Sequence, residues 1–71
     1  MTAQEWIAAF ATELGTTPPD DATFEALLAL AAEAAHSSER VAAPIACYLA
    51  GAAGVDTGRA IELAKQVSSS G

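Results

Sequence analysis

The sequence predicts an all-α protein, a compact bundle of four short helices. Nineteen of the 71 residues are alanine, which has the highest helix propensity because it loses no side-chain entropy. Large apolar side chains recur at intervals of three and four residues, the spacing that places them on one face of a helix. Capping and stop residues bound these stretches. We therefore expect helices over residues 3–14, 21–36, 44–53 and 57–67.

The first helix has clear signals at both ends. Thr2 and Glu5 have the spacing of a capping box, in which a hydroxyl and a carboxylate satisfy backbone amides reciprocally. Gly15 ends the helix because glycine adopts the left-handed conformation, and the Pro18-Pro19 pair prevents it from resuming. The apolar stripe of this helix consists of Trp6, Ile7, Phe10 and Leu14.

The second helix begins where Asp20 or Asp21 caps its free amides, and it frays near His36. Its buried stripe consists of Phe24, Leu27, Leu28, Ala31 and Ala35, widened by Leu30. A connector over residues 37–43 follows, because Pro44 fits best at the first position of a helix and restricts the residue before it.

The third helix carries no charge, so we expect it to be the most buried of the four. Gly54 ends it, and Asp56 caps the fourth helix. Residues 1–67 then form a single domain, and residues 68–71 form a disordered tail. The expected core consists of Trp6, Phe10, Leu27, Leu28, Ile45, Leu49 and Ile61.

The charge excludes one class of partner. Nine acidic residues against three basic ones give a net charge of −6, and residues 1–39 hold seven acids and no Lys or Arg. Such a surface repels phosphate backbones, so we expect no nucleic-acid binding. The longest uncharged run, residues 41–55, is too short to span a bilayer, and the N-terminus lacks a signal peptide pattern. The single cysteine suits a cytoplasmic protein.

Few residues suggest chemistry. Glu33 and His36 have the Glu-x-x-His spacing of carboxylate-bridged metal bundles, but such sites need two of these motifs and this chain has one histidine. Cys47 lies in an apolar helix without a nearby base, where a thiol stays protonated. Ser38 lacks the Asp-Ser-Leu context of carrier proteins that bear a phosphopantetheine arm. We therefore expect no enzyme, no cofactor and no metal ion.

Several segments carry a family resemblance that covers residues 6 to about 64. The most specific is a run of the form Ala-His-x-x-Glu-Arg-x-Ala-Ala-Pro, and the others are Trp6, Leu14-Gly15, Leu27-Leu28 and Tyr48-Leu49-Ala50-Gly51. Together they resemble a small, uncharacterised, all-helical bacterial domain family. Its members occur alone or associated with molybdenum-cofactor guanylyltransferase-like proteins. The chain departs from the family at Val41, where members commonly carry proline.

We expect a non-enzymatic accessory or protein-interaction domain, and the resemblance implies a link to molybdenum-cofactor metabolism. The partner is a protein or a second copy, because a small core beside an uncharged third helix leaves an apolar strip for a homodimer. The alternative is a bundle that binds a small ligand or a metal ion through the connector from His36 to Pro44. Under either hypothesis the candidate site residues are His36, Glu39, Arg40, Pro44 and Tyr48.

Overall fold

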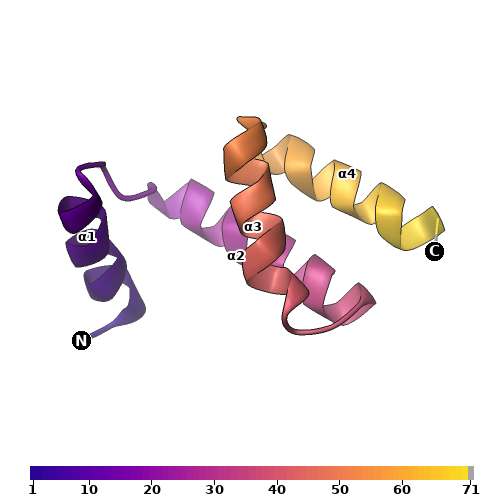
Figure 1. Cartoon of the computed structure of the whole chain (residues 1–71), viewed down its shortest axis with the longest axis horizontal. Helices are drawn as coiled ribbons and strands as arrows, with labels where there is room; N and C mark the ends of the chain where they lie inside the picture. The colour runs from indigo at the N-terminus through magenta and orange to yellow at the C-terminus, as the bar shows by residue number, and fades with distance from the viewer. Residues whose placement is uncertain (71) are drawn as a thin grey trace.

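The computed structural model describes residues 1–70 and confirms the predicted all-α four-helix bundle. Its helices are α1 (Ala3–Leu14), α2 (Asp21–Ser37), α3 (Ala42–Ala53) and α4 (Thr57–Ser70). Both α3 and α4 pack on α2, with α3 crossing it, whereas α1 stands apart from them at the N-terminal end (Figure 1). No helix in residues 1–70 is long and apolar enough to cross a membrane.

The predicted helix ends are formed by local hydrogen bonds. The backbone amide of Glu5 donates to the Thr2 hydroxyl at 3.1 Å, and the Thr2 amide donates to the Glu5 carboxylate at 2.7 Å, which completes the capping box. The Thr23 amide donates to the Asp20 carboxylate at 2.8 Å, and this bond lowers the pKa of Asp20 below its usual value. Gly15 and Gly54 are both left-handed, with φ of 78° and 70°, and end α1 and α3.

Three helix boundaries differ from the prediction. The second helix ends at Ser37, one residue beyond the predicted end. The third helix begins at Ala42 instead of residue 44, which is compatible with Pro44 because the first turn of a helix leaves its amides without intrahelical acceptors. The fourth helix continues to Ser70, so residues 68–70 are helical rather than a disordered tail, and Gly71 lies outside the described residues. The Ser69 and Ser70 hydroxyls each donate to the carbonyl four residues earlier. The single proton of the Ser68 hydroxyl is shared between the Glu33 carboxylate at 2.7 Å and the Ala64 carbonyl at 3.1 Å.

The interior is lined by small side chains rather than by the predicted large ones. Within the described chain the buried hydrophobic residues are Ala11, Leu30 and Ala60. Because alanine fills little volume, the helices approach closely and leave most large side chains outside. The predicted core was therefore wrong in most of its members: Leu27 and Ile61 are half-buried, and the exposed ones are Trp6, Phe10, Leu28, Ile45 and Leu49.

The prediction that the third helix is the most buried was also wrong, since α3 has no fully buried residue. The side of α3 that meets α2 carries small side chains, namely Ala42, Ala43, Ala46, Cys47 and Ala50, all half-buried. Its larger side chains are exposed. Hydropathy placed this helix in the core because an uncharged helix is normally buried, but here its apolar surface faces outward.

Candidate interaction surface

The five predicted site residues lie between the last turn of α2 and the middle of α3, and all are exposed. His36 is in the last turn of α2, Glu39 and Arg40 are in the loop, and Pro44 and Tyr48 are on α3. Within residues 1–70 no side-chain hydrogen bond or ion pair joins any two of them. The connector therefore presents its polar groups to solvent separately.

An open hollow of about 570 Å³ adjoins this connector. Apolar side chains form most of its wall, among them Val41, Ile45 and Leu49, and Glu39 supplies the one charged group. A shallow apolar hollow with a single carboxylate suits the side chain of a protein partner better than a polar metabolite.

Groups able to hold a metal ion do not gather in the described part of the chain: no cluster of three or more His, Cys, Asp or Glu side chains occurs there. Glu33, the predicted neighbour of His36, instead accepts the Ser68 hydroxyl and ties α2 to α4. Cys47 is half-buried, its thiol lies 3.8 Å from the Leu27 carbonyl oxygen, and burial raises the pKa of that thiol. A raised pKa keeps Cys47 protonated and unreactive near neutral pH.

Two groups of exposed apolar side chains each follow one helix, whereas Leu28, Leu49, Leu63 and Val67 are exposed outside these groups. The first, which we call the α1 face, consists of Trp6, Phe10 and Leu14. The Trp6 and Phe10 rings stack with centroids 5.0 Å apart and planes inclined by 32°, although Trp6 remains 54% exposed. The second, the α3 face, consists of Val41, Ile45, Tyr48 and Ala52, and its Tyr48 is 70% exposed.

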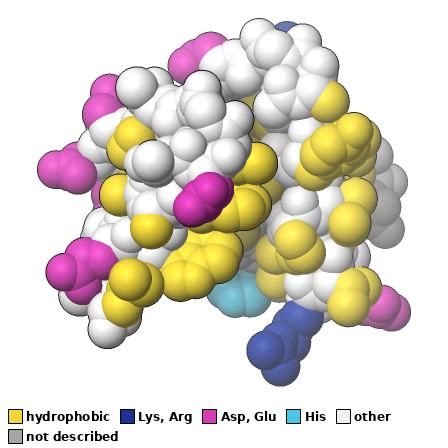
Figure 2. All heavy atoms as spheres, turned by 60° about the vertical axis from the view of Figure 1, so that its left-hand side comes forward, with side chains coloured by type: hydrophobic (Ala, Val, Ile, Leu, Met, Phe, Trp, Pro, Cys, Tyr) yellow, Lys and Arg dark blue, Asp and Glu magenta, His cyan; other side chains and the backbone are white. Residues whose placement is uncertain are grey.

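A hollow between hydrophobic walls is visible in the space-filling view. Figure 2 shows hydrophobic side chains on both sides of this hollow and acidic side chains mainly toward the edges. Contiguous exposed apolar surface of this kind is typical of sites that bind another protein.

The total surface is large for a chain of this size. The accessible surface is 5216 Å², whereas a compact monomer of 7.1 kDa exposes about 4,100 Å². The radius of gyration is 12.7 Å, against about 11 Å for a compact domain of 71 residues. The chain therefore leaves surface uncovered that a typical monomer of its mass would bury.

One family model matches the chain over residues 1–70, and its description is a domain of unknown function, DUF6457. The chain belongs to the DUF6457 family. Neither the curated proteins nor the solved structures provide a match. This family has no assigned function. The match therefore agrees with the sequence resemblance to an uncharacterised domain family.

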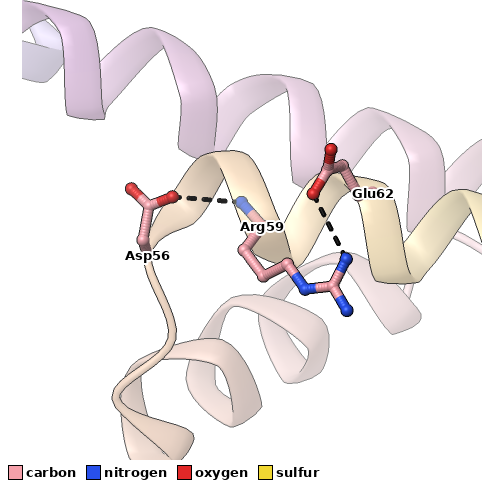
Figure 3. Close-up of polar contacts among 3 residues, drawn as sticks. All are labelled: Asp56, Arg59 and Glu62. Carbon is pink, nitrogen blue, oxygen red and sulfur yellow. Dashed lines mark hydrogen bonds and ion pairs between the residues drawn. The ribbon is translucent and has the colours of Figure 1, made fainter.

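One polar cluster in the DUF6457 domain has a structural explanation. The Asp56 carboxylate accepts the Arg59 backbone amide at 3.2 Å, and the Arg59 guanidinium pairs with Glu62 at 3.3 Å (Figure 3). The first contact caps α4, as predicted, and the second joins neighbours on one turn of that helix. Both partners of the ion pair are exposed, so the pair contributes little to stability.

Sequence reasoning missed the α1 face because it assigned Trp6 and Phe10 to the core. It expected an apolar strip beside the third helix but placed Ile45 of that helix in the core. A usable signal was present in α3. Around this helix, alanines occupy one side and larger residues occupy the opposite side. Two segregated apolar sides indicate that a helix is covered on both, by its own chain on one and by a partner on the other.

Proposed function

We propose that this DUF6457 domain is a non-enzymatic interaction domain that docks onto a protein partner through its α1 face. The observation that carries the proposal is the exposed aromatic pair of Trp6 and Phe10, followed one turn later by Leu14. Side chains at these spacings are the anchors of an amphipathic helix that binds in a groove. Tryptophan and other aromatic side chains are also common among residues that dominate binding energy.

The charge around the α1 face indicates the chemistry of the partner. Residues 1–39 hold seven acidic residues and no Lys or Arg, and Glu5 and Glu13 lie on α1 itself. A second copy would bring a surface of the same sign and be repelled, whereas an apolar groove edged by Lys and Arg would be attracted. The partner we infer therefore has an apolar groove with a basic rim.

The isolated position of α1 favours this docking mode. Between α1 and α2 lies a hollow of about 330 Å³ lined by apolar side chains including Ile7, Phe24 and Leu28. α1 stands clear of α3 and α4, so a partner has access to its outer side (Figure 1).

The family resemblance suggests which partner to test first. Members of the resembling family are associated with molybdenum-cofactor guanylyltransferase-like proteins, so we propose an accessory role beside such an enzyme in a bacterial cytoplasm. The DUF6457 domain then contributes binding and no catalytic group. Its single half-buried thiol is compatible with a reducing compartment.

Capture from the native cell with matched variants tests this function. The Trp6→Ala/Phe10→Ala double variant is expected to lose the partner that the unaltered domain retains, because both anchors are removed. A control, Tyr48→Ala, alters a still more exposed aromatic residue on the α3 face and should retain that partner. Raising the salt concentration should weaken capture by the unaltered domain, since opposite charges attract across the interface.

Retention of the same proteins by both variants and the unaltered domain would show that the α1 face binds nothing specific. The identity of the retained protein then tests the accessory role beside a molybdenum-cofactor enzyme. A guanylyltransferase-like protein would support that role, and an unrelated basic protein would contradict it. Trp6 is the sole tryptophan, so its fluorescence can report binding of the purified partner directly. The emission maximum should shift to shorter wavelength when the partner buries Trp6.

A further inference from the structure

The α3 face has a pattern that a partner helix would match. Val41, Ile45, Tyr48 and Ala52 follow one another at spacings of four, three and four residues. This is the heptad spacing of a seam along which two helices pack side by side. Val41 precedes α3 but already has helical backbone angles, φ −66° and ψ −17°, so all four residues share one register.

The α3 face differs from the α1 face in charge. α3 carries no charged residue, and the uncharged run extends over residues 41–55. Two copies of a chain with a net charge of −6 repel each other, so they associate where no carboxylate is brought to the contact. Among the four helices, α3 alone meets this condition.

The surface left uncovered is of the size that a dimer buries. The accessible surface of 5216 Å² exceeds the value for a compact monomer of this mass by about 1,100 Å², and part of this excess belongs to α1, which stands apart. Each partner in a standard protein interface buries about 800 Å². A hollow of about 320 Å³ between α3 and α4, lined by Leu49, Leu63 and Val67 among others, extends the apolar surface beside the seam.

We propose that a second copy of this chain covers the α3 face, forming a two-fold symmetric dimer in which α3 packs antiparallel to α3 of the other copy. A two-fold axis is the usual symmetry of homodimers and makes the same patch meet itself. The antiparallel direction sets the positive end of each helix dipole beside the negative end of the other. In this register Val41 lies opposite Ala52 of the other copy, and Ile45 lies opposite Tyr48.

This inference is independent of the proposed function, because it uses a different face and a different partner. The dimer leaves both α1 faces open and presents them as a pair. Loss of the dimer leaves the docking proposal intact, and loss of docking leaves the dimer intact.

Sedimentation equilibrium of the whole chain tests the interface. The unaltered protein is expected to be a dimer at micromolar concentrations, and Tyr48→Glu to raise the dimer dissociation constant by about a hundredfold or more, because each dimer would bury two unpaired carboxylates. Since Tyr48 is largely exposed within one chain, circular dichroism should show that the variant keeps its helices. The matched control Leu14→Glu adds the same charge to α1 and should leave the dimer unchanged.

Cysteine cross-linking tests the antiparallel direction in a background where Cys47 is replaced by alanine. Val41→Cys mixed with Ala52→Cys is expected to give a disulfide-linked pair, whereas neither variant alone should. Identical positions at the ends of an antiparallel seam lie about 16 Å apart along the axis, beyond the reach of a disulfide. A monomer at high micromolar concentration, a dimer insensitive to Tyr48→Glu, or cross-linking of Val41→Cys to itself would each overturn the proposal.

Discussion

Replacement of Leu30 by alanine is expected to lower the free energy of unfolding by about 2–5 kcal/mol. Leu30 is only 3% exposed, and it is the one large apolar residue among the buried residues of the described chain. It lies on α2, the helix against which α3 and α4 both pack, and it lines the hollow that those helices share. Truncation removes apolar contacts and leaves a cavity where the three helices meet.

Such a loss is large for this protein. A domain of this length has an unfolding free energy of roughly 4–11 kcal/mol, so the Leu30→Ala variant should be partly unfolded at moderate temperature. Denaturant melts monitored by circular dichroism measure the change. The matched control is Leu14→Ala on α1, which removes the same atoms from an exposed position and should cost less than about 1 kcal/mol. Equal costs for the two variants would show that α2 is not the centre of the fold.

Enlargement of Ala60 to leucine is expected to destabilise the chain by about 1–3 kcal/mol. Ala60 is 8% exposed and lies in the first turn of α4, on the side that packs against α2. A small residue allows the two helix backbones to approach closely there. Three additional carbon atoms have no room unless α4 moves outward, which would also stretch the Ser68 to Glu33 contact near the other end of α4.

Gln66→Leu is the control for Ala60→Leu, because Gln66 is exposed on the same helix. Thermal melts of both variants should show a clear decrease in the midpoint for Ala60→Leu and little change for Gln66→Leu. An unchanged or raised midpoint for Ala60→Leu would mean that α2 and α4 are not packed through their small residues.

The helices and their ends could be predicted because short-range interactions specify them. Thr2, Asp20 and Asp56 each cap a helix by accepting the backbone amide three residues later. Gly15 and Gly54 end helices because glycine readily adopts the left-handed conformation. The end of α4 was missed because a run of serines normally lacks helical preference. In the folded chain each serine hydroxyl contacts a carbonyl oxygen of the preceding turn. The Ser68 hydroxyl also contacts the Glu33 carboxylate on α2.

The packing could not be predicted because alanine-rich helices are apolar on several sides. In α3, periodicity is equally compatible with burial of Ile45 and Tyr48 or of Ala46 and Ala50. The fold buries the alanines, because small residues let α3 approach α2 closely, and so Leu49 remains 59% exposed. Leu30 was assigned to the margin of its stripe and is the most buried large residue. Which face lies inside depends on neighbours that are distant in sequence.

The location of the candidate site residues could be predicted from the sequence, but whether their side chains contact one another could not. His36 and Arg40 were chosen because they are the one histidine and the first Lys or Arg of the chain. In the structure both are exposed near the junction of α2 and α3. The sequence gives no means of knowing that their side chains stay apart. The α1 face was not predicted because Trp6 and Phe10 are residue types that normally fill a core.

One chain leaves much apolar surface exposed, and in the dimer that we propose a second copy covers the α3 face. The thermal midpoint measured by calorimetry as a function of protein concentration tests this proposal directly, because a dimer that dissociates on unfolding becomes more stable as concentration rises. We predict an increase of roughly 3–6 °C for each tenfold rise in concentration for a dimer of this size, and no dependence for Tyr48→Glu. A midpoint for the unaltered chain that is independent of concentration would contradict the account.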